Sequence, residues 1–193
     1  MRKAEIRRKT TETNINIVLN IDGSGQTDIT TGSRILDHML SAFGKHALFD
    51  LTISATGDDI HHLSEDVAIV LGQAINQALG DKKGITRFAG ASVPMDEALS
   101  EVIVDISGRP YCLVNAKFSE NDMFGFPTDL VRHFLESLAT EGRVTLHACI
   151  KYGENDHHKC ESLFKALGIA LSRAVVLDSR RLNQTPSTKG RLD

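Results

Sequence analysis

Apolar and polar positions alternate along some stretches of the chain and follow a helical spacing along others. In the first half, residues 14–21 and 48–55 place apolar side chains at about every second position, which predicts half-buried strands. Residues 33–45 and 60–79 carry apolar residues three and four positions apart, which predicts two helices, the first capped by Ser33. The first half is therefore predicted to alternate strands with helices.

The second half shows the same kinds of pattern in a similar order. Strands are predicted near 100–106, 111–118 and 143–151, and helices near 127–140 and 156–177. No linker rich in Pro, Gly or Ser separates the halves, so they are expected to share one core. The predicted class is α/β (α+β), with helices packed against mixed sheets.

Sequence matches between the halves indicate an internal duplication. Four segments of the first half recur in the same order in the second, at offsets of 85 to 96 residues. The matched pairs are 17–23 with 102–108, 38–40 with 133–135, His61-His62-x-x-Glu65 with His157-His158-x-x-Glu161, and Leu71-Gly72 with Leu167-Gly168. We expect one domain, 1–193, made of two repeats of about 1–88 and 89–185 and a C-terminal tail, 186–193.

Composition and charge exclude several classes of protein. The 193 residues are 41% hydrophobic and 24% charged, as in globular rather than disordered chains. A net charge of −3 offers no basic field for nucleic acid, and no apolar run approaches the ~18 residues of a membrane helix. The charged N-terminus lacks the apolar segment of a signal peptide. Cys112, Cys149 and Cys160 form no CxxC pair and are expected to be free thiols in a reducing cytoplasm.

The repeated His-His-x-x-Glu motif has the spacing of metal ligands. Positions i and i+4 of a helix share a face, so His61 can act with Glu65, whereas His62 points about 100° away. Adjacent histidines therefore suit two different ions. A single copy of the motif is better explained by a solvated helix N-terminus, since polar residues favour first turns. Two copies in matched register favour metal binding.

Two further histidines, His38 and His133, occupy equivalent places on the other predicted helix of each half. We expect them to be third ligands. Either one alone would be explained as an ordinary histidine on a helix face. His46 and His147 have no counterpart and are expected to be structural. Four ligands each would close two structural zinc sites, or leave open positions on two octahedral ions such as Mn²⁺, which a thiolate-free set suits better. The eight expected ligands are His38, His61, His62, Glu65, His133, His157, His158 and Glu161.

A further group of polar residues suggests an anion. Arg87, Arg109 and the tail segment 187–190 would supply guanidinium groups, a hydroxyl, an ammonium and a backbone approach that glycine permits. These groups suit a phosphate monoester. Surface arginines and a frayed chain end explain the same residues equally simply.

Seven motifs occur in order over nearly the whole chain and together resemble one family. They are Arg8-x-Thr10-Thr11-Glu12-Thr13, Leu36-Asp37-His38-Met39-Leu40, His61-His62-x-x-Glu65-Asp66, Pro94-Met95-Asp96-Glu97-Ala98-Leu99, Asp105-Ile106-Ser107-Gly108-Arg109-Pro110-Tyr111, Gly153-Glu154-Asn155-Asp156-His157-His158-x-x-Glu161-x-x-Phe164-Lys165-Ala166 and Ser187-Thr188-Lys189-Gly190. In this combination the chain resembles imidazoleglycerol-phosphate dehydratase.

The resemblance implies dehydration of D-erythro-imidazoleglycerol phosphate to imidazole acetol phosphate in histidine biosynthesis. It implies a duplicated α/β fold, two Mn²⁺ ions per active site, which we expect to bind the imidazole ring, and a 24-subunit homo-oligomer with sites between subunits. The family's metal ligands fall on the eight residues above. Its substrate contacts fall on Glu12, Arg87, Arg109, Ser187, Thr188 and Lys189.

Proton transfer in such a reaction needs a carboxylate. Glu12 is the first candidate for it, and Asp96 or a ligand glutamate is an alternative. Glu12 is equally well explained as a group that only hydrogen-bonds the substrate.

Two departures and two rival functions accompany the resemblance. Many members carry Asp directly before the first His pair, where this chain has Ile60, and the segment from Gly57 to His61 is shorter than in many members. Asp58 or Asp59 is the candidate replacement for orienting a ligand imidazole. A di-metal phosphate-ester hydrolase could use the same ligands to activate water. Non-catalytic metal binding is the other rival, and it leaves the arginines and Lys189 without a task.

Overall fold

The computed structural model describes residues 1–192. Both halves follow the same order of elements, three strands, a helix, a strand and a helix. The first half contains β1 (Lys3–Lys9), β2 (Thr13–Asn20), β3 (Thr27–Thr30), α1 (Arg34–Ala47), β4 (Asp50–Gly57) and α2 (Ile60–Leu79). The second contains β5 (Phe88–Met95), β6 (Ala98–Asp105), β7 (Tyr111–Asn115), α3 (Asp129–Gly142), β8 (Thr145–Tyr152) and α4 (Asp156–Val175). The predicted duplication is confirmed.

The strands form two four-stranded sheets with the same topology. Their orders are β1-β2-β4-β3 and β5-β6-β8-β7, so equivalent strands occupy equivalent places. In each sheet one pair is parallel, β3 with β4 and β7 with β8, and the other pairs are antiparallel. The helices α1 and α3 are the crossovers that join the parallel strands, as parallel pairing requires. The prediction of mixed sheets is confirmed.

The apolar pattern of the sequence does not predict three of the strands, and all three lie at sheet edges. They are β1, β3 and β5. An edge strand tolerates charged residues on its open side, and β1, with the sequence KAEIRRK, buries a single side chain, that of Ala4. Strand β3 has four residues, too few to show a period. Weak apolar alternation is thus a consequence of their position.

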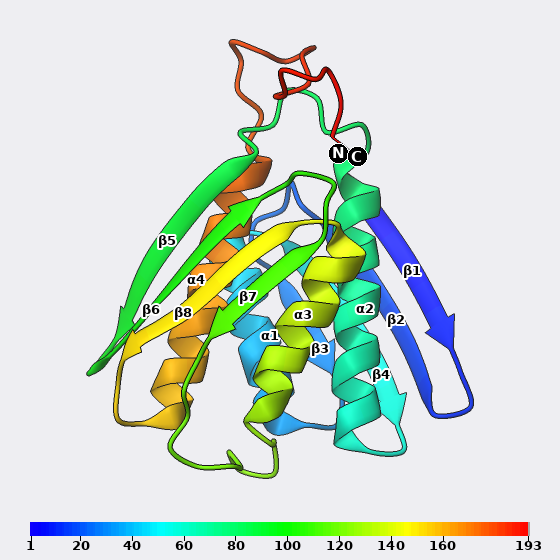
Figure 1. Ribbon diagram of the computed structural model, residues 1–193. Helices are drawn as coiled ribbons and strands as arrows, with labels where there is room; N and C mark the ends of the chain where they lie inside the picture. Colours follow the sequence, from blue (N-terminus) through cyan, green and yellow to red (C-terminus); the bar gives the residue numbers. More distant parts are fainter. Residues whose placement is uncertain (193) are drawn as a thin grey trace.

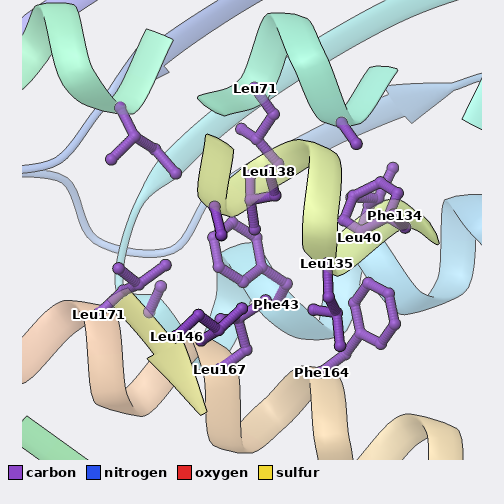
Figure 2. Close-up of a cluster of buried hydrophobic side chains, with 14 of the residues drawn as sticks. Leu40, Phe43, Leu71, Phe134, Leu135, Leu138, Leu146, Phe164, Leu167 and Leu171 are labelled. Atoms are coloured by element: carbon purple, nitrogen blue, oxygen red, sulfur yellow. The ribbon is translucent and has the colours of Figure 1, made fainter. Parts of the chain in front are cut away.

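The four helices lie between the two sheets (Figure 1). Helix α2 packs on the first sheet and α4 on the second, and the helices contact each other across the halves, α1 with α4 and α2 with α3. Side chains from all four helices and β8 converge in one core, as Figure 2 shows for Phe43, Leu71, Leu138, Leu146 and Leu167. None of the helices in residues 1–192 has the length and apolar character to cross a membrane. The three cysteines are free, as predicted.

Two glycines allow the cross-half helix pairs to approach closely. A Cβ at Gly72 of α2 would lie 2.7 Å from the carbonyl oxygen of Leu138 in α3. A Cβ at Gly168 of α4 would lie 2.5 Å from the carbonyl oxygen of Phe43 in α1. These are the matched glycines of the two Leu-Gly pairs. The repeat therefore preserves the helix contacts that bring residues of different halves together.

Replacing Gly168 by Ala is expected to destabilise the fold by about 1–3 kcal/mol, because the added methyl group meets backbone atoms that cannot rotate away. Alanine is intrinsically the better helix residue by about 1 kcal/mol, so an open site would show the opposite sign. Urea unfolding measures the change in free energy of unfolding. The exposed Gln77→Ala on α2 is the control and is expected to stay within about 0.5 kcal/mol of wild type. A stabilised Gly168→Ala protein would contradict the close approach.

Candidate metal centre

The His-His pairs lie in the first turns of α2 and α4, where capping residues hold their backbone. The Asp59 side chain accepts the N–H of His62, and the Asn155 side chain accepts the N–H groups of His157 and His158. These are ordinary N-cap interactions. They fix the start of each helix and hence the direction in which each imidazole points.

The first cluster joins α1 to α4. Nε2 of His38 lies 2.9 Å from Oε2 of Glu161, and Nε2 of His157 lies 3.1 Å from the same oxygen. The two imidazole rings are stacked, with centroids 5.3 Å apart and planes 9° from parallel. The other carboxylate oxygen of Glu161 accepts from Nζ of Lys165 at 2.6 Å. We call this set the α1–α4 cluster.

The second cluster is its repeat equivalent and joins α2 to α3. Oε2 of Glu65 lies 4.0 Å from Nε2 of His61 and 3.3 Å from Nε2 of His133. The two rings have centroids 5.1 Å apart. The position equivalent to Lys165 is Ile69, which has no charge to pair with Glu65. We call this set the α2–α3 cluster.

Both clusters fit a metal ion. In each, one nitrogen or oxygen atom of every residue lies within 4.8 Å of those of the others. Ligands about 2.1 Å from a common ion would be separated by roughly 3–4.2 Å, which the observed distances approach. Nε2 of His133 is buried and has no hydrogen-bond partner among the described residues, although it faces Glu65 and His61. A buried nitrogen without a partner is costly unless something binds it.

The charge on Glu161 suits a ligand role. Burial alone would raise the pKa of this carboxyl group, but hydrogen bonds from Lys165 and His38 outweigh burial and lower the pKa to about 2. The group is therefore ionised at neutral pH, and its oxygens act only as acceptors or ligands.

The second histidine of each pair, His62 or His158, points away from the cluster that contains the first. Nδ1 of His62 lies 2.9 Å from Asp58 and 3.1 Å from Asp59, and Glu12 lies close to the same group. Nδ1 of His158 lies 2.7 Å from Oε2 of Glu97. The adjacent carboxylates raise the pKa of both imidazoles, Asp58 acting on His62 and Glu97 on His158.

The residues expected to replace the missing Asp before the first His pair lie beside His62. Ile60 is the first residue of α2, and the carboxylates of Asp58 and Asp59 contact the imidazole of His62 from the residues just before the helix. The shortened segment from Gly57 still supplies the contact.

The residues expected to bind an anion lie at the opposite end of the molecule. Arg87 donates its backbone N–H to the carbonyl of Ala174, near the end of α4. From 157 to 174 the helix advances 17 residues, or about 25 Å at 1.5 Å per residue. The tail, which includes Ser187, Thr188 and Lys189, lies at this end as well (Figure 1), and the Arg87 guanidinium donates to the carbonyl of Pro186 at 2.8 Å.

Arg87 and Arg109 differ in their surroundings. The Arg87 guanidinium pairs with Asp105 at 2.7 Å and is largely buried. Arg109 lies in the loop after β6, at the same end, and is exposed. Within one chain the expected anion-binding residues and the two clusters are thus separated by the length of the helical layer.

The sequence analysis did not identify two polar partners of the expected ligands, Lys165 beside Glu161 and Glu97 beside His158. In the sequence, Lys165 and Glu97 stand out only as parts of motifs. For Glu97, the internal repeat contains a signal. At the offset of 85 that relates 17–23 to 102–108, Glu12 aligns with Glu97 and not with Asp96. Asp96 is exposed, and its carboxylate lies 3.7 Å from Nε2 of His158. His46 and His147 belong to neither cluster in the part of the chain that the structure describes.

Comparisons with known proteins agree with the motifs. A family model described as imidazoleglycerol-phosphate dehydratase matches residues 31–171. Curated proteins of that name include one from Dehalococcoides mccartyi (strain 195), 61% identical over 192 residues that span 100% of this chain and 98% of the relative. The Bacillus subtilis protein is 51% identical over 195 residues and 100% of both chains.

Solved structures extend the agreement to the fold. The Staphylococcus aureus imidazoleglycerol-phosphate dehydratase superposes with a TM-score of 0.84 at 38% identity, covering 91% of this chain and 99% of that one. The Pyrococcus furiosus enzyme, solved in complex with (S)-C348, gives a TM-score of 0.85 at 40% identity and covers 97% and 100%. On this evidence, the chain belongs to the imidazoleglycerol-phosphate dehydratase family, as its motifs predicted.

Proposed function

We propose that this dehydratase of histidine biosynthesis converts D-erythro-imidazoleglycerol phosphate to imidazole acetol phosphate at a site with two Mn²⁺ ions. The observation that carries the proposal is the pair of His₂Glu clusters, each built across the halves by helices whose contacts the duplication preserves. Imidazole and carboxylate ligands without thiolate suit Mn²⁺. The free cysteines are consistent with a cytoplasmic enzyme.

Neighbouring subunits complete the site in this proposal. Each cluster supplies three ligands, and the remaining two expected ligands, His62 and His158, point elsewhere. The expected phosphate contacts lie about 25 Å along α4 from His157, too far for one small substrate to touch both ends of a chain. A homo-oligomer, which we propose has 24 subunits, would bring the two ends of different chains together.

The residues of this chain then have defined tasks. Bound Mn²⁺ would supply Lewis-acid stabilisation to the imidazole ring of the substrate. Arg87, Arg109, Ser187, Thr188 and Lys189 would hold the phosphate and so orient the ring.

Glu12 is the first candidate to move the proton, because it lies at the tip of the β1–β2 turn beside His62, and its carboxylate accepts no hydrogen bond from the described residues. Asp96, exposed at the equivalent β5–β6 turn, is the second candidate. A carboxylate free of other partners is available to a substrate proton.

Turnover of the substrate tests the proposal. Protein loaded with Mn²⁺ is expected to form the keto product, and EDTA-stripped protein and His61→Ala are expected to lose at least about 100-fold in rate, because metal-assisted catalysis is worth several kcal/mol. Product formation is followed by the absorbance of the enolised ketone. Release of inorganic phosphate in place of the ketone would support the hydrolase, the rival that uses the same ligands. No reaction by fully loaded protein would overturn both.

A further inference from the structure

Glu97 sits at the tip of the β5–β6 hairpin with both carboxylate oxygens engaged. Oε1 accepts the backbone N–H groups of Glu154 and Asn155 at 3.1 and 2.7 Å, just before α4 begins. Oε2 accepts from Nδ1 of His158 at 2.7 Å. A glutamate carboxyl group is ordinarily ionised at neutral pH. Its two oxygens, as hydrogen-bond acceptors, link the hairpin to the first turn of α4.

An ionised carboxylate can only accept hydrogen bonds, so its partner nitrogen must carry the proton. In a neutral imidazole with a proton on Nδ1, the lone pair is on Nε2. We propose that Glu97 is a positioning residue that holds His158 in the Nδ1–H tautomer, which leaves the lone pair of Nε2 available as a metal ligand for a neighbouring subunit. Nε2 lies 3.7 Å from the exposed carboxylate of Asp96, too far for a hydrogen bond that would fix its proton. Such contacts also make an imidazole a stronger donor to a metal. The inference rests on the proposed function, since it takes His158 as a ligand.

The duplication supports a division of labour between two equivalent glutamates. Glu12 and Glu97 occupy equivalent hairpin tips. In the first half, Asp58 and Asp59 hold Nδ1 of His62, which leaves Glu12 without a hydrogen bond to that imidazole. In the second half Glu97 performs this task itself. Glu97 therefore holds the imidazole of an expected ligand, whereas Glu12 is available to contact the substrate.

The variant Glu97→Gln isolates this role from a purely structural one. Its amide oxygen can keep both hydrogen bonds from the backbone at Glu154 and Asn155, which places the amide NH₂ against Nδ1 of His158. Because NH₂ is a donor, it favours an unprotonated Nδ1 and moves the proton to Nε2, the nitrogen that a metal needs. Glu101→Gln, on β6 of the same hairpin, removes one carboxylate that pairs with Lys151 and is the matched control.

The experiment reads the tautomer in metal-free protein. Solid-state ¹⁵N NMR of histidine-labelled protein, at a pH where the imidazoles are neutral, distinguishes protonated from unprotonated nitrogens, and the spectrum of His158→Gln assigns the signals. Wild type and Glu101→Gln are expected to show Nδ1–H at His158, and Glu97→Gln to show Nε2–H. Calorimetric titration with Mn²⁺ is expected to show affinity about 10–100-fold weaker in Glu97→Gln alone.

Two results would overturn the inference. One is an Nε2–H tautomer at His158 in the wild type, which needs no folded variant to observe. The other is an unchanged tautomer and unchanged Mn²⁺ affinity in Glu97→Gln. Neither measurement involves the substrate, so failure of the proposed reaction and failure of this inference are separate outcomes.

Discussion

Oligomers that contain both His61→Ala and Arg109→Ala subunits are expected to recover about one quarter of the wild-type activity, although each variant alone is expected to be inactive. His61→Ala removes an expected ligand from the α2–α3 cluster, and Arg109→Ala removes an expected phosphate contact. If each site takes its cluster from one chain and its phosphate contacts from another, random 1:1 mixing gives an intact combination at about a quarter of sites. Either variant alone has no intact site.

The physical reason is the length of the subunit. The α2–α3 and α1–α4 clusters lie near the N-terminal ends of α2 and α4, whereas Arg109 follows the far end of β6. Glu97, which contacts His158, directly precedes β6, whose eight residues extend about 24 Å to Asp105. A site confined to one chain would need a substrate as long as the subunit.

Co-expression with two different affinity tags yields the mixed particles, and the rate of keto product formation is measured after purification through both tags. Arg109 suits this test because its side chain makes no hydrogen bond within residues 1–192, so its removal leaves the fold intact. Each variant carrying both tags is the control and is expected to stay near background. Mixed particles as inactive as these controls would refute a site shared between chains.

Much of the fold follows from local patterns in the sequence. The strands that lie inside the sheets, such as β2 and β4, bury alternate side chains and show a clear period. The two long helices show broad apolar faces because they are covered by a sheet and by another helix. Edge strands are paired on one side only. Fewer of their side chains need to be apolar, so the apolar alternation in their sequences is weak.

The sequence alone identifies the eight candidate ligands, but not how they group in space. The repeat places His38 in the same half as His61, yet the structure joins His38 to His157 and Glu161 of the other half. Apolar periodicity shows which face of a helix is buried and says nothing about which helix covers it. The matched glycines Gly72 and Gly168 mark close contacts, but their partners became evident only in three dimensions.

Replacing Asp156 by Asn is expected to lower the free energy of unfolding by about 3–5 kcal/mol, the largest effect on stability that we predict. Asp156 and Lys159 form an ion pair of 2.7 Å between side chains only 9% and 6% exposed. The carboxylate also accepts the backbone N–H groups of Ser119 and Glu120. The variant leaves the ammonium of Lys159 buried without its counter-charge.

The same carboxylate connects the loop before α3 to the first turn of α4. That turn carries His157 and His158, and α3 carries His133, so the ion pair steadies parts of both clusters. Urea unfolding of metal-free protein at fixed subunit concentration measures its contribution without the added effect of metal binding. The surface pair of Asp81 and Lys83 provides the control, and Asp81→Asn is expected to cost at most about 1 kcal/mol.

A double variant separates the charge from the loop contacts. Asp156→Asn with Lys159→Met removes both charges, so the cost of the unpaired ammonium disappears while the weakened hydrogen bonds from the loop backbone remain. It also removes the 3.2 Å hydrogen bond that Nζ of Lys159 donates to Oγ of Ser119. It is expected to be more stable than Asp156→Asn alone, because an apolar replacement of a buried pair is often close to neutral. If the double variant is as unstable as the single one, the unpaired charge is not the main cause, and the loop contacts at Ser119 and Glu120, including the one from Lys159, account for the loss.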